Sequence, residues 1–538
     1  MTERLTVHDA TYDLLRKLGL TTIFGNPGST EESFLRDFPD DFTYVLGLQE
    51  ASVLTMADGF AQVRNKPALV NVHTTAGTGN ALGSLVGAYR ANTPLIVTAG
   101  QQTREMSIVD PFLNNPDATT FPKPWVKWAY EPARAEDVPA AFMRAYAVAM
   151  QPPKGPVFLS IPLDDWDKPA LGPAAVRDVS ERIAPDADRL AAFAERISRA
   201  RRPLLLLGGE VDRDGGWDAG VAFAEKLKAP VYDAAIPDRI SFPGNHPLSQ
   251  GQLPMTIAGV CEVLRGYDLV IAIGAQVFRY YPFVAGDWVP EGTEVLQITA
   301  DPHVSAVAPV GDSLIGSVRT ALEQLVDLIE VPGDRVAPQP RELREITPVE
   351  AADAPLTPDQ VYHVIRTVKS DDTAMVNEST STISQHFSWC PATQSNTYYS
   401  TPSGGIGWAL PASVGIALGD RERGVDRRVI ATIGDGSFEY SVQGLWTAAQ
   451  HNLPIVFVAF RNGEYAILKS FAELEKTPKV PGLDLPGLDI ESLGRGFGVR
   501  SVTVDGTESL ARELETALSA DGPTLIVVPT SSQMPFLG

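Results

Sequence analysis

The residues with the most specific chemical pattern lie in the last third of the chain, after two apolar runs. Asp435 follows the run RRVIATIG, and Asn462 follows the run PIVFVAFR. Carboxyl ends of neighbouring parallel strands meet at one edge of a sheet, so this carboxylate and this amide can share a hard cation. The backbone carbonyl of Glu464 would add a third oxygen, and Mg²⁺ usually takes its remaining ligands from phosphates and water. The pattern predicts a Mg²⁺ site beside a bound phosphate group.

The residues around Asp435 also suit a diphosphate. Gly434, Gly436 and Ser437 form the turn from the apolar run into a helix, where backbone N–H groups can reach phosphate oxygens. A Gly-Asp-Gly turn is common by itself. The combination of a strand, this turn, a gap of 25 residues and then Asn462-Gly463 is rare by chance. We therefore interpret the region as a metal–diphosphate site.

A second group of reactive side chains follows three apolar runs in the first third. Ser29 follows TTIFG, Glu50 opens a helical segment after YVLGL, and His73 follows ALVNV. We expect these three side chains to converge at one edge of one sheet. Each has a simpler explanation: Ser29 could be a helix N-cap, Glu50 could favour a helix N-terminus, and His73 could be a hydrogen-bonded core histidine. The glycines after His73 are spaced GxGxxxG, which is weak evidence for a dinucleotide site.

The elements that must position these groups are short β-branched runs alternating with longer helical stretches such as 50–63 and 138–151. Such runs, bounded by Gly, Pro or Asn, are typical of parallel strands buried on both faces. They occur at 21–25, 44–48, 68–73, 95–100 and 157–162, at 203–209, 229–235, 268–275 and 293–301, and at 373–379, 427–437, 454–463 and 524–530. Three such arrays predict an α/β fold of three doubly wound parallel-sheet domains.

Two connectors set the expected domain limits. Residues 163–190 are rich in Pro and Asp, and residues 331–357 contain five prolines without a strand pattern. We expect an N-terminal domain at 1–170, a central domain at 190–332 and a C-terminal domain at 356–538.

Composition excludes several classes of function. The chain has 538 residues, 44% hydrophobic and 20% charged, with a net charge of −22, so nucleic acid and anionic membrane surfaces are poor partners. Two cysteines cannot form a disulfide framework and indicate a reducing compartment. We see no signal peptide and no apolar run long enough to cross a membrane. These features favour a cytoplasmic protein.

At this point the sequence resembles the thiamine-diphosphate-dependent decarboxylase family. The family signature is GDG, about 25 residues and then Asn, together with a glutamate in the first domain that Glu50 matches. The resemblance extends over almost the whole chain and is greatest to the benzoylformate decarboxylase group. It is carried by FGNPGS (24–29), LQEA (48–51), HTTAGTGNA (73–81), PLIVTAGQQTR (94–104), DDWDK (164–168), NESTST (377–382), GDGS (434–437) and LWTAAQ (445–450).

The resemblance implies a pyrimidine-binding, a central and a diphosphate-binding domain, with thiamine diphosphate and Mg²⁺ as cofactors. Ca²⁺ could substitute for Mg²⁺. It also implies a homotetramer whose active sites are shared, with Glu50 from one subunit and Asp435 and Asn462 from its neighbour. Ile406 would support the bent cofactor, and the Gly404 carbonyl would hold its amino group. The implied cofactor-binding residues are Glu50, Thr380, Ser381, Gly404, Ile406, Gly434, Asp435, Gly436, Ser437, Asn462, Gly463 and Tyr465.

The implied reaction is the non-oxidative decarboxylation of a 2-oxo acid to an aldehyde and CO₂, and we expect the acid to be aromatic and similar to benzoylformate. Ser29 would bind the substrate carboxylate. His73 would move protons to or from the reacting oxygen, a task suited to an imidazole at neutral pH. Together with Glu50 these are the expected catalytic residues.

The sequence departs from the family in the expected acyl pocket. Tyr281 stands where a second active-site histidine is usual, and it either takes over that role or simply packs. Ser400 replaces an aromatic wall, and Ile467 replaces a smaller alanine. These changes leave the preferred acyl group open. The expected pocket residues are Pro27, Ser29, Tyr281, Ser400, Ile467, Leu468 and Phe471.

Other functions remain as alternatives. One is an acetolactate-synthase-like enzyme or a carboligase acting on other 2-oxo acids or aldehydes, and carboligation could also be a side activity of a decarboxylase. Another is a non-catalytic protein that kept the fold, against which intact Glu50, Asp435 and Asn462 argue. An NAD-linked enzyme lacks its fingerprint.

Overall fold

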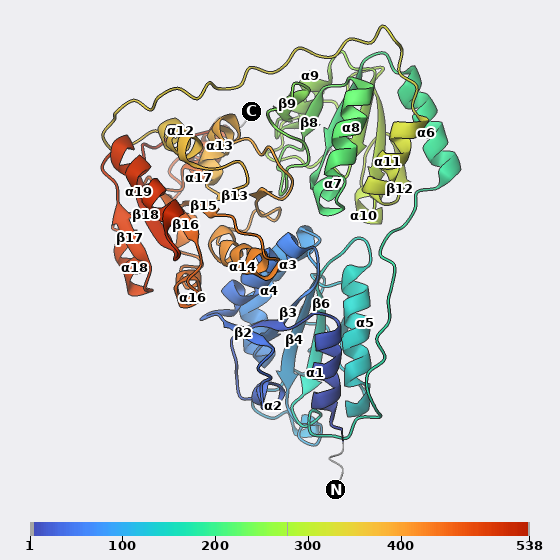
Figure 1. The fold of residues 1–538 in the computed structure, drawn as a ribbon, viewed down its shortest axis with the longest axis vertical. Helices are drawn as coiled ribbons and strands as arrows, with labels where there is room; N and C mark the ends of the chain where they lie inside the picture. Colours follow the sequence, from blue (N-terminus) through green and yellow to red (C-terminus); the bar gives the residue numbers. More distant parts are fainter. Residues whose placement is uncertain (1–4, 277, 536–538) are drawn as a thin grey trace.

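The computed structural model describes residues 5–276 and 278–535, and these form three six-stranded sheets (Figure 1). Every strand pair in the three sheets is parallel. Helices lie on the faces of each sheet, and the three units meet around a common centre in Figure 1. The predicted α/β fold of three doubly wound parallel-sheet domains is confirmed.

The first sheet has the order β2-β1-β3-β4-β6-β5. Its strands are β1 (Thr22–Gly25), β2 (Thr43–Leu46), β3 (Ala68–Val72), β4 (Leu95–Gln101), β5 (Ala129–Tyr130) and β6 (Val157–Pro162). The helices of this domain are α1 (Val7–Lys17), α2 (Glu32–Leu35), α3 (Glu50–Arg64), α4 (Thr74–Arg90) and α5 (Val138–Met150), with 3₁₀ turns η1 (Ser107–Val109) and η2 (Ala135–Asp137).

The central sheet has the order β12-β11-β10-β7-β8-β9. Its strands are β7 (Pro203–Leu207), β8 (Val231–Asp233), β9 (Ser249–Gln252), β10 (Leu269–Ile273), β11 (Glu294–Thr299) and β12 (Asp312–Ile315). Its helices are α6 (Ala187–Arg199), α7 (Gly209–Arg213), α8 (Trp217–Leu227), α9 (Ile257–Leu264), α10 (Pro302–Ala306) and α11 (Val318–Leu328).

The third sheet has the order β14-β13-β15-β16-β18-β17. Its strands are β13 (Ala374–Glu378), β14 (Tyr398–Tyr399), β15 (Val429–Gly434), β16 (Ile455–Arg461), β17 (Arg500–Thr503) and β18 (Thr524–Pro529). Its helices are α12 (Pro358–Val368), α13 (Ile383–Trp389), α14 (Ala409–Glu422), α15 (Asp435–Phe438), α16 (Gly444–Gln450), α17 (Ala466–Leu474), α18 (Ile490–Gly496) and α19 (Thr507–Ser519), with the turn η3 (Thr380–Thr382).

Numbered within their own domains, the first and third sheets share the order 2-1-3-4-6-5, whereas the central sheet has the order 3-2-1-4-5-6. Five strands were not predicted from apolar runs in the sequence, and all five lie at an edge of their sheet: β5, β9, β12, β14 and β17. An edge strand has a neighbour on one side only, so it need not be a continuous apolar run. The segments SQGQ of β9 and RSVT of β17 illustrate this.

The first and third domains meet through α3 and α14, which lie side by side in Figure 1. A Cβ added to Gly415 would lie 1.8 Å from the backbone oxygen of Met56, and one added to Gly59 would lie 2.2 Å from that of Ala412. The Trp408 indole donates a hydrogen bond of 2.7 Å to buried Asp58. Glycines at the crossing therefore allow two backbones to touch.

Across the described part of the chain, no helix is both long enough and apolar enough to cross a membrane.

Candidate active site

A cavity of about 40 Å³ lies at the carboxyl ends of β13, β15 and β16. The structure places around it these residues that the sequence singled out: Thr380, Ser381, Gly434, Asp435, Gly436, Ser437, Asn462, Glu464, Tyr465 and Ile467. Parallel register brings these segments together, since Gly434 of β15 pairs with Phe460 of β16. The metal and diphosphate candidates thus line one hollow.

Asp435 is buried at the start of α15. One carboxylate oxygen accepts the N–H of Gly436 at 2.8 Å, and the other accepts the N–H of Gly463 at 2.7 Å. Burial raises the pKa of Asp435, although these N–H groups act in the opposite direction. A Cβ added to Gly436 would lie 2.3 Å from the Tyr465 ring, so glycine is required beneath that ring. The Asp435 carboxylate is therefore held by backbone N–H groups and not by a positively charged side chain.

The other proposed metal ligands lie in the loop after β16. The Asn462 side-chain oxygen accepts the Glu464 N–H at 3.1 Å. The Glu464 carboxylate binds Lys469 and Ser532, which leaves its backbone carbonyl as the group that can face a cation. Nowhere in residues 5–276 and 278–535 do three His, Cys, Asp or Glu side chains form a metal-binding group. One carboxylate, one amide and one carbonyl suit a hard cation that takes its other oxygens from a bound diphosphate and water.

The glycine segment before α14 has the conformation that its residue types predict. Gly404 and Gly407 have φ of +73° and +96°, in the left-handed region that favours glycine. Buried Glu378, at the end of β13, accepts the N–H groups of Trp408 and Ala409, each at 3.0 Å. This carboxylate caps α14 and so anchors the segment that contains Ile406.

Glu50 is the first residue of α3, yet it is not the residue that caps the helix. The Gln49 side chain accepts the N–H groups of Ala51 and Ser52 instead. The buried Glu50 carboxylate accepts from the Asn26 amide at 3.2 Å and from the Asn80 amide at 2.9 Å. The loop after β1 and helix α4 therefore hold this carboxylate, which a preference for a helix N-terminus does not explain.

His73 lies next to Glu50. A Cβ added to Gly77 would lie 3.3 Å from both the Glu50 and the His73 side chains, so the two flank this glycine. The His73 side chain is 20% exposed, and its Nδ1 lies 2.8 Å from Glu31. Ser29 is exposed. The N-cap interpretation of Ser29 is wrong, because α2 begins at Glu32 and its N-cap is Glu31.

The expected acyl-pocket residues come together only in part. Tyr281 is 57% exposed, and its ring centroid lies 4.7 Å from that of Phe471 on α17. Leu468 is on the same helix and is 45% exposed. The Ser400 hydroxyl donates to the Asn377 carbonyl at 3.0 Å, so it is already engaged. Pro27 is exposed in the first domain.

These residues form two half-sites. All residues that line the cavity at Asp435 lie between 358 and 533, whereas the side chains that contact Glu50 and His73 belong to the first domain. The chain thus offers an acid–base half in one domain and a metal–diphosphate half in another.

Several residues at these half-sites were missed by sequence reasoning. Glu378 is the last residue of β13, so the strand-end rule could have found it, whereas Glu31 lies beyond the end of β1, at the N-cap of α2. Ser531 and Gln533 follow β18 and line the cavity at Asp435. The metal–diphosphate pattern covers the ends of β15 and β16 and does not extend to β18.

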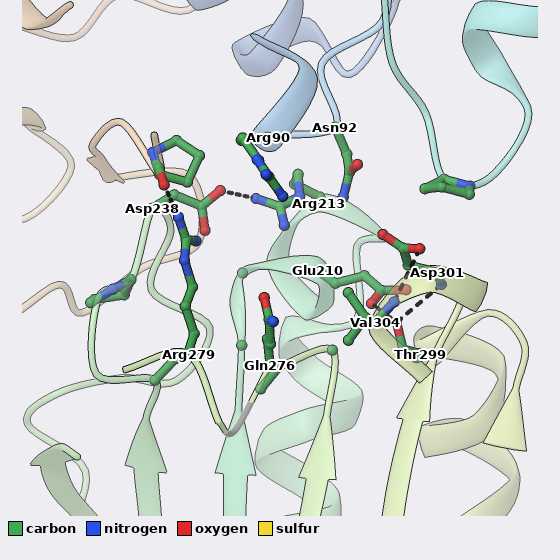
Figure 2. A pocket seen from close by; sticks show the side chains of 18 of the residues that line it. Arg90, Asn92, Glu210, Arg213, Asp238, Gln276, Arg279, Thr299, Asp301 and Val304 are labelled. Carbon is green, nitrogen blue, oxygen red and sulfur yellow. Dashed lines mark hydrogen bonds and ion pairs between the residues drawn. The ribbon is translucent and has the colours of Figure 1, made fainter. Parts of the chain in front are cut away.

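A separate cleft of about 230 Å³ lies between the first and central domains (Figure 2). The order of the central sheet is that of many dinucleotide-binding folds, and the cleft lies where that order reverses. Within it, Arg213 forms an ion pair with Asp238, and the half-buried Glu210 carboxylate accepts a hydrogen bond from the Thr299 hydroxyl at 2.7 Å. Burial raises the pKa of Glu210 to about 7. No residue predicted for the active site lines this cleft.

Comparison with known protein families identifies the family of this chain. The model of the thiamine pyrophosphate enzyme N-terminal TPP binding domain matches residues 5–120, that of the central domain matches 190–325, and that of the C-terminal TPP binding domain matches 378–528. The chain belongs to the thiamine pyrophosphate enzyme family. Its cofactor is therefore thiamine diphosphate, and both half-sites lie within the two TPP binding domains.

Individual relatives within this family are similar over nearly the whole chain. Benzoylformate decarboxylase from Pseudomonas aeruginosa is 45% identical over 98% of this chain and 100% of its own length. The structure of benzoylformate decarboxylase from Polynucleobacter necessarius is 48% identical, with a TM-score of 0.96 over 99% of this chain and 100% of that one. The thiamine diphosphate-dependent 4-hydroxybenzoylformate decarboxylase from Rhodococcus jostii RHA1 is 42% identical, with a TM-score of 0.94 over 98% and 100% of the two chains.

Proposed function

We propose that this enzyme decarboxylates an aromatic 2-oxo acid of the benzoylformate type to an aldehyde and CO₂ without oxidation. The observation that carries the proposal is the placement of His73 beside buried Glu50, with exposed Ser29 on the neighbouring turn. It is supported by full-length similarity to two benzoylformate decarboxylases and to a 4-hydroxybenzoylformate decarboxylase.

Thiamine diphosphate, when bound, supplies a reactive carbon that adds to the substrate ketone and accepts the electrons released with CO₂. Asp435, Asn462 and the Glu464 carbonyl hold Mg²⁺, for which Ca²⁺ can substitute. The backbone around Gly436 and Gly463 lies beside the diphosphate. Ile406 and Gly404 support the rest of the cofactor, and Thr380, Ser381 and Tyr465 line its site.

Glu50 exchanges a proton with the aminopyrimidine of the cofactor. Asn26 and Asn80 hold its carboxylate in one orientation, so no reorganisation is needed when the proton moves. Ser29 donates a hydrogen bond to the substrate carboxylate. His73 would give a proton to the substrate oxygen and take it back as the aldehyde leaves, and the proton that replaces CO₂ on the carbonyl carbon would come from water.

An aromatic acyl group fits the side chains near the third-domain half-site. Tyr281 and Phe471 offer two rings in contact, tilted by 44° to each other, and Leu468 and Ile467 add apolar surface. Tyr281 packs against Phe471, which favours a role in shaping the pocket over a role in proton transfer.

We propose a homotetramer in which each site combines Glu50 of one subunit with Asp435 of another. The segment Ser107–Val109 and the residues after it expose Ile108 (89%), Val109 (71%) and Phe112 (86%). This segment lies beside the start of α4, because the Thr75 hydroxyl donates to the Asn114 carbonyl at 3.1 Å. Such an apolar surface next to the first half-site suits contact with a second copy. The cytoplasm is the expected compartment for its two buried free cysteines.

The alternative is an acetolactate-synthase-like enzyme or a carboligase that joins two small carbonyl compounds. The aromatic pair at Tyr281 and Phe471 leaves less room for a second acceptor than small side chains would. Carboligation remains a side activity that an added aldehyde would reveal.

The test is aldehyde release from benzoylformate and 4-hydroxybenzoylformate, with thiamine diphosphate and Mg²⁺ present or omitted, beside acetolactate formation from pyruvate. We expect cofactor-dependent aldehyde release at about 1 s⁻¹ or faster. Acetolactate as the main product, or no aldehyde from protein shown to bind the cofactor, would overturn the assignment.

A further inference from the structure

Glu31 is a buried carboxylate that the proposed reaction does not yet use. It is 1% exposed, in the turn that joins β1 to α2. One of its carboxylate oxygens, Oε1, accepts three hydrogen bonds: from the Thr30 hydroxyl at 2.8 Å, from the Gly100 N–H at 2.7 Å and from the Thr74 N–H at 3.3 Å. All three groups donate, so this oxygen is fixed as an acceptor.

The second oxygen, Oε2, lies 2.8 Å from His73 Nδ1. The Thr30 hydroxyl gives its proton to Glu31, so its oxygen can accept at the 3.2 Å distance to the same Nδ1. Two acceptors therefore face Nδ1, which must carry a proton. In neutral His73 the free lone pair is then on Nε2, the nitrogen for which the described residues offer no hydrogen-bond partner.

Close packing holds the imidazole and the carboxylate together. A Cβ added to Gly28 would lie 2.0 Å from His73 Nδ1, and one added to Gly100 would lie 2.4 Å from the Glu31 carboxylate. The ring is thus confined between the backbone at Gly28 and the carboxylate, with room for only one orientation.

Two other titratable groups face this pair. Tyr44 of β2 lies near Glu31, and burial raises the pKa of its hydroxyl, which keeps it neutral at ordinary pH. Glu50 lies across Gly77 from His73. Glu31 is therefore the carboxylate in direct contact with the imidazole.

We propose that Glu31 is the positioning residue of the active site. It keeps the proton of His73 Nδ1 in place and thereby presents Nε2 to the substrate as the atom that gives the proton and takes it back. The inference rests on the proposed role of His73 and adds what sets its tautomer and orientation.

The decisive variant is Glu31→Gln. A glutamine must turn its carbonyl toward the N–H groups of Gly100 and Thr74, which leaves its NH₂ group facing His73. Nδ1 then has to accept, and the proton moves to Nε2. The matched control is Glu32→Gln, the same change at the exposed neighbouring residue. Both variants are prepared as full-length, cofactor-loaded protein, and their folding is compared by circular dichroism.

Two readouts separate positioning from a purely structural role. We expect kcat of Glu31→Gln to fall at least about 10²-fold, the scale of general acid–base catalysis, with KM changed less than about 3-fold. The second readout is carbethoxylation of His73 by diethyl pyrocarbonate, followed by mass spectrometry against exposed His303. Because the reagent attacks an unprotonated nitrogen, we expect the His73 rate to fall several-fold in Glu31→Gln and to stay unchanged in Glu32→Gln.

A folded Glu31→Gln with wild-type kcat and wild-type His73 reactivity would overturn the proposal. Should that variant fail to fold, Glu31→Asp shortens the side chain by one methylene and draws the carboxylate away from Nδ1, and unchanged kcat and His73 reactivity there would overturn the proposal equally. The carbethoxylation result does not need turnover. A wild type inactive on every 2-oxo acid would sink the proposed function, whereas an unaltered His73 rate would sink only the role of Glu31.

Discussion

The first and third domains share one strand order but use it for different chemistry. In both, the sheet runs 2-1-3-4-6-5, so β3 corresponds to β15 and β2 to β14. In the first domain the ends of β2 and β3 lead to Glu50 and His73, which handle protons. In the third domain the end of β15 leads to Asp435, which suits a cation and a phosphate. The shared scaffold fixes where the groups lie, and the loop residues decide what they do.

The correspondence extends to the helices that join the domains. Helix α3 follows β2 and α14 follows β14, and these two equivalent helices pack against each other. They are capped differently: Gln49 caps α3 from the adjacent position, whereas Glu378 reaches α14 from another strand. The cap of α3 leaves Glu50 free for chemistry, and the cap of α14 anchors the glycine segment before it.

The largest expected effect is on the acid–base half. Glu50→Gln removes the proton-exchanging carboxylate but keeps its size, so kcat should fall about 10³-fold. The dissociation constant of thiamine diphosphate, measured by quenching of tryptophan fluorescence, should change less than about 3-fold, because the diphosphate is held in the other domain. An equal loss of cofactor affinity would remove the functional distinction between the domains.

The metal–diphosphate half should respond in the opposite way. In Asp435→Asn the new NH₂ group faces the N–H of Gly436 or Gly463, and the cation loses its only carboxylate ligand. We expect cofactor affinity to fall about 10²-fold, with a higher Mg²⁺ concentration needed for half-saturation. The same fluorescence titration checks this, with surface Asp371→Asn as control. Unchanged affinity would show that the cation is held elsewhere.

The contact between equivalent helices can be tested without touching either half-site. Gly415→Ala places a Cβ against the Met56 backbone, and we expect it to lower the free energy of unfolding by about 1–3 kcal/mol. Gly83→Ala, at a helical glycine with open space around its Cβ position, should be neutral or slightly stabilising. Chemical denaturation of both variants measures the difference. Equal free energies of unfolding for the two variants would mean that α3 and α14 can move apart without loss of stability.

The smallest expected effect concerns the cap of α14. Burial raises the pKa of Glu378 to about 7, although N–H groups of α14 oppose the shift. The folded protein then keeps a proton that the unfolded chain releases near pH 4.3, so this group's contribution to stability is present below that pH and is lost as pH rises through about 7. We expect the melting temperature of wild type relative to Glu378→Gln to fall between pH 5 and 8. A pH-independent difference would contradict the shift.

Sequence patterns predicted the strands that are buried on both faces and the residues that belong to a motif of fixed spacing. The central strands, the Asp435–Asn462 pair and Glu50 all met one of those conditions. Edge strands such as β9 and β17 were not predicted, because they have a neighbouring strand on one side only and need not be apolar throughout. Glu31 escaped because its role depends on His73, 42 residues further on, and no local pattern records that contact. Tyr281 and Phe471 were chosen from the family resemblance, and only the structure shows that their rings touch.

The most direct test of the account is complementation between Glu50→Gln and Asp435→Asn. Each variant alone should be nearly inactive. Co-expressed chains pair at random, and a mixed pair contains one site with both changes and one site with neither, so about a quarter of wild-type activity should return. No recovery, from mixed assemblies verified by differential tagging, would show that each chain builds its own site and would contradict the shared site that combines Glu50 of one subunit with Asp435 of another.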